Sequence, residues 1–568
     1  MTEEKINSNA NPYVEASFSE VQPYVAPDAK TVPEFVPPAP TAPPVKKNSA
    51  WSFTTVQKTF AFVALILGYI FNRFVFHGTA PGLGATVFFE VALVSALVYL
   101  QREGSRLRAG NYLWFAVLML YPVSFILFDN PTAKVWGVLF MIVASMFWVY
   151  SSASGIGVFR QTFVYDFFRS TFAAPFRNFV AQPVAMFKPA KDQKTRVLRY
   201  VLLGLLIAIP FTAIIAALLI SSDETFAKMI GIENVVDEIY KFFFRLIFAV
   251  PVAMMIFSVC YSAVRNRDAV SAKKSSYKGG RGNHIIFVTA LIPVILLYVV
   301  YFISQFAYFT GAFVNMLPAE LTYSEYARQG FFELCAVVVI NLLMILLTVL
   351  LCKKNDNGRY NLSVKFVISV LSLFSAMLVA ITVAKMVMYT SAYGLTHKRI
   401  YTLWFTLVLL CLVAVALLKI LFPKFKFWNG AVSVVVILFV LLSFANVDAI
   451  IAKYNVQWYQ QGKISWMGEE LLYDLDKSAV KYLDALYEDD TEVLNEVDSR
   501  YHDYSYTYYD KDDMYDSWYD DAKETVGAQI KDYYKYLASY DNDIVGFNLS
   551  AYSAERVFDR RSVVPYTE

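Results

Sequence analysis

Apolar residues occur along this chain in blocks of about twenty, and short polar segments separate the blocks. A helix of roughly 17–25 apolar residues is long enough to cross the hydrocarbon core of a bilayer. The pattern therefore predicts an all-α fold, a polytopic transmembrane helical bundle of about 11 helices. The predicted spans are 53–76, 83–100, 112–128, 135–154, 197–220, 241–264, 285–307, 330–352, 364–390, 400–421 and 430–448.

The two ends of the chain are polar. Residues 1–50 contain nine prolines between Pro12 and Pro44, which favours a disordered Pro-rich cytoplasmic tail or, alternatively, a docking peptide for a cytoplasmic partner. Residues 449–568 hold 25 acidic and 12 basic side chains. We expect them to form a small extramembrane helical C-terminal domain, acidic and Tyr-rich, beyond a bundle that covers 51–448. We expect helices there because apolar residues recur at the spacing of one helix face, at Leu472, Leu475, Ala479, Leu483 and Leu486.

The distribution of Lys and Arg between loops indicates the orientation. With the N-terminus inside, the inner loops hold 23 basic residues and the outer loops hold 8, and only the cluster His397-Lys398-Arg399 runs against the bias. Short loops rich in Lys and Arg stay in the cytoplasm. We therefore expect a multi-pass protein of the cell (plasma) membrane with a cytoplasmic N-terminus and an extracytoplasmic C-terminal domain. An even number of helices would reverse the side of that domain.

The inner segment 155–196 repeats Phe at helical spacing beside Arg. This pattern is typical of a helix that lies in the membrane interface, where Phe enters the acyl boundary and Arg meets anionic head groups. We expect the lipid bilayer as a partner, with anionic lipids at the inner basic loops. Either the segment ties helix groups together at the surface, or it is a regulatory lipid sensor.

Composition limits the chemistry that the chain can carry. The residues are 57% apolar, above the 45–50% of an ordinary soluble protein. The four cysteines lie in apolar runs, the four histidines do not cluster, and no metalloprotease, P-loop or nucleophile-elbow motif occurs. We predict no catalytic residue, no metal, no cofactor and no nucleic-acid partner; a membrane or cytoplasmic protein partner stays possible.

Ionisable side chains within membrane helices are costly and point to function or to pairing. The predicted topology puts four of them in the outer half of the bilayer. Either they line an outward-facing polar pocket, or they are cations reaching toward head groups and acids in structural pairs. The candidate pocket consists of Glu90, Arg245, Glu333 and Lys385.

Several stretches resemble a known family. They are Leu67–Arg73 with Gly82-Leu-Gly84, the run from Ala392 to Tyr401, the run from Asn446 to Asn455, the run from Asp474 to Val480, and Phe547–Ser550. Together they resemble the bacterial polytopic membrane proteins called domain of unknown function 4153/4173, from about residue 55 to 558. The resemblance implies a membrane bundle with a helical tail. It implies no established activity and supplies no catalytic residue.

Some polar residues in these stretches lie near the predicted outer helix ends. They either dock the C-terminal domain onto the bundle or line the rim of the pocket. This set is Arg73, Tyr393, Thr396, Arg399, Tyr401, Asn446, Asp448 and Tyr454.

Three functions remain open from the sequence. The first is a protein for sensing, regulation or envelope organisation. The second is a transporter or permease for a small solute, lipid or ion, which three interior prolines and the intramembrane charges favour. The third is an envelope enzyme that acts at the outer leaflet.

Overall fold

The structure is a computed structural model. It describes residues 51–76, 81–155, 163–187, 235–267, 280–314, 331–355, 357–466, 468–493, 524–539 and 546–565, together with single positions between 197 and 219.

The first apolar blocks form helices at the predicted places. α1 begins with a capping box, in which the Thr54 hydroxyl accepts the Gln57 N–H at 3.1 Å and the Gln57 side chain accepts the Thr54 N–H at 3.2 Å. Pro122 separates α3 from α4, because proline has no N–H to continue the helix. The elements are α1 (Thr55–Phe71) with the π-helical turn η1 (Asn72–Phe76), α2 (Leu83–Arg102), α3 (Ala109–Leu120), α4 (Val123–Leu127) and α5 (Pro131–Ala153).

The later blocks form six more long helices. Gly394, with a φ of 75°, ends α16, and the Thr396 hydroxyl caps α17 by accepting the Arg399 N–H at 3.3 Å. These helices are α11 (Val235–Arg265), α13 (His284–Val314), α15 (Phe331–Leu351), α16 (Leu362–Tyr393), α17 (His397–Leu421) and α18 (Phe427–Ser443).

These elements confirm the predicted all-α membrane bundle. Among the described residues, nine helices have the length and hydropathy of a membrane span. A tenth span forms if α18 is joined to α19 (Val447–Gln460), from which it is bent by 60°. The predicted span 197–220 lies outside the described residues except for single positions. The chain is thus a multi-pass membrane protein.

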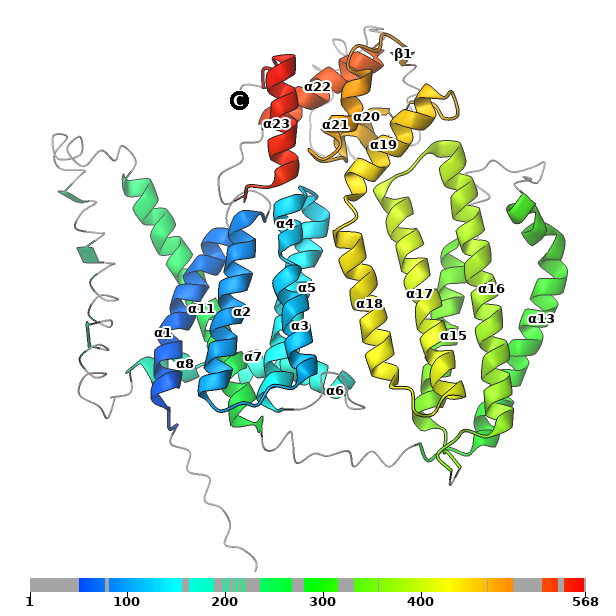
Figure 1. Cartoon of the computed structure of the whole chain (residues 1–568), viewed down its shortest axis with the longest axis horizontal. Helices are drawn as coiled ribbons and strands as arrows, with labels where there is room; N and C mark the ends of the chain where they lie inside the picture. Colours follow the sequence, from blue (N-terminus) through cyan, green and yellow to red (C-terminus); the bar gives the residue numbers. More distant parts are fainter. Residues whose placement is uncertain are drawn as a thin grey trace, which may run out of the picture. The chain divides into compact units, whose positions relative to one another are not determined.

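The long helices pack in two groups (Figure 1). The first helix group contains α1 to α5 and α11, and the second contains α13 and α15 to α18. Extensive contacts between described helices stay within each group; the second surrounds a core that includes Ile368 and Leu371. The groups meet at Phe439 of α18, whose ring centroid lies 5.8 Å from that of Tyr121 and 5.1 Å from that of Phe140.

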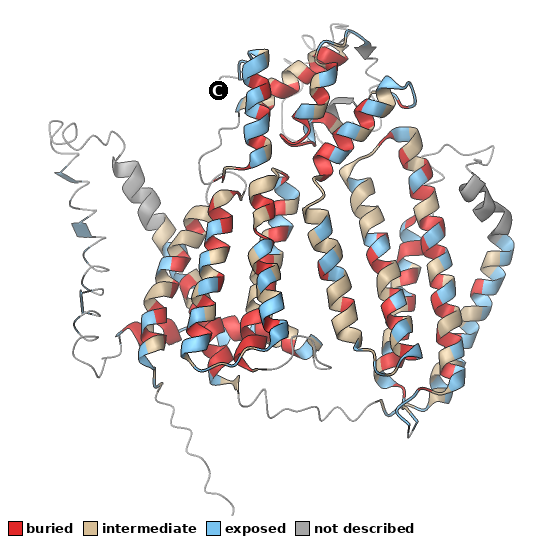
Figure 2. Cartoon of the chain, viewed as in Figure 1, coloured by how far each residue is buried: buried red, intermediate tan, exposed pale blue. Residues whose placement is uncertain are grey.

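Burial follows this arrangement. Figure 2 shows buried positions along the sides of the helices that face neighbours and exposed positions on the outward sides. Large apolar side chains lie on those outward sides, with Leu113, Ile303 and Phe332 exposed by 70–73%. Such surfaces are unfavourable in water and suit contact with lipid acyl chains.

Short helices cross the ends of the first helix group opposite the C-terminal helices (Figure 1). They are α6 (Phe163–Phe168), the π-helical turn η2 (Arg169–Ala173), α7 (Ala174–Arg177) and α8 (Ala181–Phe187). α7 packs on α11 and α8 on α1, where the Gln182 amide donates to the Ala61 carbonyl at 3.0 Å. Phe168, Phe172 and Phe176 are exposed by 57–62%. The membrane-surface role of the segment 155–196 stays a prediction.

The C-terminal helices, here called the tail, surround an apolar core of their own. The five positions from Leu472 to Leu486 that carry the predicted helical spacing are all buried in it. Tyr533, Tyr534 and Ile530 of α22 complete this core. The tail consists of α19, α20 (Gly468–Tyr473), α21 (Val480–Leu483), η3 (Asp484–Leu486), β1 (Glu492–Val493), β2 (Glu524–Thr525), α22 (Val526–Ser539) and α23 (Leu549–Arg561), with β1 and β2 paired antiparallel.

Candidate functional site at the junction of bundle and tail

Three aspartates from distant parts of the chain lie where the tail meets the helix ends, two of them buried and one partly buried. Asp129 precedes α5, Asp448 lies in the first turn of α19, and Asp476 lies in the turn before α21. Asp448 is 1% and Asp476 7% exposed, and the Asp129 side chain is 17% exposed. A buried carboxylate is costly unless it is hydrogen-bonded or paired. With their partners these residues form the junction cluster: Asp129, Asn130, Lys134, His397, Asp448, Asp476 and Asn548.

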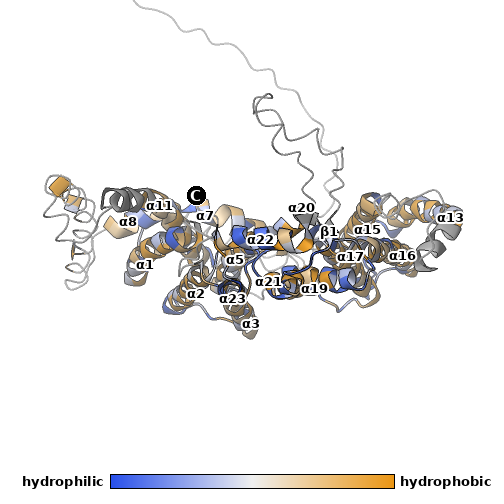
Figure 3. Ribbon diagram, turned by 90° about the horizontal axis from the view of Figure 1, so that it is seen from above, coloured by the Kyte–Doolittle hydropathy of each residue, from blue (hydrophilic) through white to orange (hydrophobic). Residues whose placement is uncertain are grey.

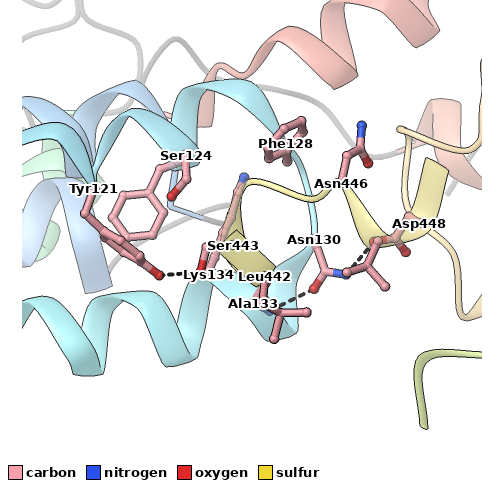
Figure 4. Close-up of a pocket in the computed structure, with 12 residues that line it drawn as sticks. Tyr121, Ser124, Phe128, Asn130, Ala133, Lys134, Leu442, Ser443, Asn446 and Asp448 are labelled. Atoms are coloured by element: carbon pink, nitrogen blue, oxygen red, sulfur yellow. Dashed lines mark hydrogen bonds between the residues drawn. The ribbon is translucent and has the colours of Figure 1, made fainter. Parts of the chain in front are cut away.

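Local sequence places Asp448 at the start of a helix. Asn446 is left-handed, with a φ of 47°, and its side chain accepts the Ala449 N–H at 3.3 Å, which caps α19. A carboxylate in the first turn is also stabilised by the helix dipole. Asp448 Oδ2 accepts from Asn130 Nδ2 at 2.5 Å (Figure 4). His397 Nε2 lies 2.7 Å from Asp448 Oδ1, and because a carboxylate only accepts, this nitrogen carries the proton.

Asp476 lies directly against Asp448. Its N–H donates to Asp448 Oδ1 at 3.3 Å, and its own Oδ1 accepts the Ser478 N–H at 2.7 Å. Within the described residues its Oδ2 has no hydrogen-bond partner. Burial, and after it the negative charge of Asp448, raise the pKa of Asp476 well above its ordinary value. The Tyr533 hydroxyl donates to the carbonyl oxygens of Leu475 and Asp476 at 3.1 and 3.3 Å and so holds the turn from the other side.

Asp129 connects the first helix group to the last helix of the tail. Lys134 Nζ lies 3.1 Å from Asp129 Oδ1, and only 4% of this lysine side chain is exposed. Asn548, the N-cap of α23, donates from Nδ2 to the same oxygen at 2.8 Å. Two residues further, the Ser550 hydroxyl donates to the Leu127 carbonyl at 3.0 Å. The start of α23 is therefore attached to the end of α4 and the start of α5.

Backbone contact reinforces this attachment. The Leu83 N–H at the start of α2 donates to the Phe547 carbonyl at 3.1 Å. A Cβ at Gly82 would overlap the backbone of Gly546. Glycine is therefore required at 82 by the close approach of two backbones.

A second attachment joins α19 to the turn between α16 and α17. The Asn455 side chain accepts the Leu395 N–H at 2.7 Å and donates to the Leu395 carbonyl at 2.9 Å. Gly394 next to it has a φ of 75°, and a Cβ there would overlap the Asn455 amide. The amide of one tail residue thus replaces the backbone partners that this turn lacks.

A small cavity lies beside the junction cluster, between α4, α5 and the bend from α18 to α19 (Figure 4). Its volume is ≈ 20 Å³, which is room for about one water molecule. The Tyr121 and Ser443 hydroxyls, 2.9 Å apart, lie at one end and Asn130 and Asp448 at the other. Among the described residues, no group of three His, Cys, Asp or Glu side chains has an arrangement that could hold a metal ion.

Comparison with known families identifies the family of this chain. The family model of the domain of unknown function DUF4153 matches residues 115–486. The chain belongs to this family. No curated protein and no solved structure matches this chain.

The matched region of DUF4153 contains most of the junction cluster. Asp129, Lys134, His397, Asp448 and Asp476 lie within residues 115–486, while Asn548 lies beyond them. All five stretches on which the resemblance rested contribute residues to the contacts between bundle and tail, the first of them through Gly82 and Leu83. The other part of that first stretch reaches η1, where the Asn72 amide donates to the Arg245 carbonyl at 2.7 Å.

The four residues of the predicted intramembrane pocket lie on two pairs of packed helices in this DUF4153 protein. Glu90 and Arg245 lie on α2 and α11 of the first group, both partly buried. Glu333 and Lys385 lie on α15 and α16 of the second group, where the buried Lys385 interacts electrostatically with the exposed Glu333. A pocket shared by all four stays a prediction.

The predicted rim residues have structural contacts at or near the junction. Arg399 Nη1 donates to the Tyr393 carbonyl at 2.8 Å and to the Gly394 carbonyl, and its guanidinium lies 4.0 Å from the centroid of the Tyr389 ring. Thr396 and Asn446 are helix caps, and Asp448 belongs to the junction cluster. Arg73 lies in η1, and its place in a rim remains a prediction.

Sequence reasoning missed several members of the cluster. In the loop-charge pattern Lys134 is one of the eight basic residues of the outer loops, and no pattern indicates a role for Asn130. Asp476 and Asn548 lay in stretches quoted for the resemblance but received no role. The signal that could have indicated these two residues is the presence of a polar residue beside apolar positions with helical spacing.

Proposed function

We propose that this chain is a regulatory membrane protein in which the tail holds the two helix groups in one arrangement and transmits a change in its own state to both. One observation carries the proposal: the tail is bonded to each group through buried polar side chains. Asn548 bonds to Asp129 of the first group, and Asn455 bonds to Leu395 of the second.

The position of the tail supports this reading. α23 contacts α4 of the first group and α19 contacts α17 of the second, and seen from above in Figure 3, α21 lies between α23 and α19. Hydrogen bonds are directional, and a small displacement leaves buried polar groups without partners. The arrangement of the two groups and the seating of the tail should therefore change together.

The direct contact between the groups is mostly aromatic and includes a hydrogen bond between the Tyr121 and Ser443 hydroxyls at 2.9 Å. Besides the rings of Phe439, Tyr121 and Phe140, it includes Phe163 and Trp428, whose ring centroids lie 5.5 Å apart. Apolar contacts of this type are non-directional, so they permit small shifts of one group against the other. Rigid groups of helices that shift against each other, with a third element bonded to both, are a common structural basis for a change between two conformations.

The same proposal includes location and partners. We place the chain in the plasma membrane, with its N-terminus in the cytoplasm and the tail outside, on the support of the 23 basic residues in the inner loops and the 8 in the outer loops. The exposed Phe side chains of α6 to α8 would meet the inner leaflet and its anionic lipids. A membrane or cytoplasmic protein partner would receive the signal.

The test measures the distance between the helix groups when the tail is released. Spin labels at Val135→Cys on α5 and Phe405→Cys on α17, both exposed, are placed in a background without native cysteines. Pulsed electron resonance should give a narrow distance distribution that broadens in Asn548→Ala and in Asn455→Ala. Asn357→Ala, on the exposed loop between α15 and α16, is the matched control.

An unchanged distribution in both variants would contradict the proposal. A solute flux through proteoliposomes that is indifferent to both variants would favour a transporter instead. Cross-linking in native membranes should capture a partner protein with the wild type and capture less of it with Asn548→Ala.

A further inference from the structure

The junction cluster contains three carboxyls, but its ion pairs match only two of them with a cation. Lys134 pairs with Asp129, and His397 pairs with Asp448. Asp476 forms no ion pair within the described part of the chain, and its Oδ2 has no hydrogen-bond partner there. A buried carboxylate with an unsatisfied oxygen beside a second carboxylate is the costliest state available to this group.

A bound proton removes this cost. A protonated carboxyl is neutral and gains an O–H donor, while a neighbouring carboxylate is an acceptor. Asp476 donates its backbone N–H to Asp448 Oδ1 at 3.3 Å, so the two residues are in direct contact. The Asp476 Oδ2 atom, which has no partner among the described residues, is the atom that would carry the proton.

We propose that Asp448 and Asp476 form a proton-binding site, in which one proton holds the Asp476 turn of the tail against Asp448, the residue through which the tail bonds to Asn130 and His397 of the bundle. The ligand is H⁺, and the site makes the seating of the tail depend on the pH of the water that the tail contacts. This deepens the regulatory role proposed above. The effect of the proton on the arrangement of the helix groups rests on that proposed regulatory role. Proton binding itself does not, because it can be measured separately.

The sign of the pH dependence follows from the pKa of Asp476. It is raised by burial and by the charge of Asp448, so a tail in which Asp476 stays buried against Asp448 binds the proton more tightly than one in which Asp476 is exposed to water. This stabilisation is present at low pH and is lost as the pH rises through the raised pKa.

Other groups around the site can modify the midpoint. Tyr401 and Tyr533 add hydroxyl groups close to the two carboxyls. The full set of titratable or charged neighbours is Asp129 and Lys134 at the start of α5, His397 and Tyr401 on α17, Asp474 and Lys477 beside Asp476, and Tyr533 on α22.

Infrared difference spectroscopy on the full-length protein in lipid tests proton binding directly. The wild type should show the C=O stretch of a protonated, buried carboxyl at neutral pH, and this band should disappear on alkaline titration. The band should be missing in Asp476→Asn and unchanged in Asp559→Asn, a control on the exposed side of α23. A wild-type spectrum without a titrating carboxyl band would overturn the proposal even if the variant fails to fold.

A second measurement follows the seating of the tail. Spin labels at Ser553→Cys on α23 and Thr132→Cys on α5, both exposed, should report one narrow distance at low pH that broadens as the pH rises. In Asp476→Asn, where the amide imitates the neutral carboxyl, the distance should stay narrow at high pH. Broadening with the same midpoint in this variant would refute the site. If the tail responds to pH but the Val135–Phe405 distance does not, the proton site stands and the regulatory role fails.

Discussion

Replacing Asn455 with alanine should weaken the attachment of α19 to the turn between α16 and α17 by about 2–4 kcal/mol. The side chain is 2% exposed and forms two hydrogen bonds to the backbone of Leu395, at 2.7 and 2.9 Å. Alanine removes both partners and leaves one N–H and one C=O unsatisfied. Each such group costs about 1–3 kcal/mol when buried, and the lower half of that range applies because Leu395 is only partly buried.

Hydrogen–deuterium exchange provides the assay. A loss of 2–4 kcal/mol raises the open fraction of this turn by roughly 30- to 900-fold, since each 1.4 kcal/mol is about tenfold. Peptides that contain Leu395 should therefore exchange much faster in Asn455→Ala, while peptides from α15 should not change. Asn357→Ala, an exposed asparagine on the opposite loop, should leave both unchanged. Less than a threefold change at Leu395 in a folded variant would show that these two bonds contribute little and that the reasoning is wrong.

Three further predictions concern the junction. Lys134→Met should destabilise the bundle by about 3–5 kcal/mol in a denaturation assay, because it leaves a carboxylate unpaired, and adding Asp129→Asn should recover part of the loss. Gly82→Ala should push α23 away from α2 and increase proteolysis of the tail without affecting α13, since its new Cβ would overlap backbone. Under the proposed topology, an impermeant thiol reagent applied outside intact cells should modify Ser539→Cys on the tail and spare Asn357→Cys; the opposite labelling would invert the orientation.

Hydropathy predicted the long helices among the described residues, but it did not predict the break at Pro122 between α3 and α4 or the boundary between α18 and α19. Long apolar blocks predict membrane spans because the bilayer forces every backbone group to bond within its own helix. The last predicted span, 430–448, instead ends at Ser443, and a new helix starts at Val447 after a 60° bend. The composition hides this break, because the residues on both sides of it are apolar. The left-handed conformation of Asn446 that makes the bend is a local choice that hydropathy does not record.

The site was predictable only in part for a related reason. The depth of a side chain in the membrane can be estimated from its position along an apolar block of the sequence. This depth does not indicate which helices are neighbours. Glu333 and Lys385 do interact across α15 and α16, whereas Glu90 lies on α2 of the other group. The resemblance directed attention to Asp448 and Asn446. No pattern in the sequence indicated that Asp448 would be buried against Asp476.

The chemistry of the junction also bears on why a tail would be attached in this way. An apolar interface of similar size is usually at least as stable as a buried ion-pair network, so stability alone does not explain two buried aspartates and a partly buried third one. Charged and hydrogen-bonded contacts add direction, and they respond to protonation, which apolar contacts do not. Asp476 has both properties, because a directional backbone hydrogen bond holds it against Asp448 and its carboxyl can bind a proton. A permanent attachment of the tail needs neither directional contacts nor a response to protonation. An attachment that forms and breaks reversibly, and that changes the arrangement of both helix groups, needs both.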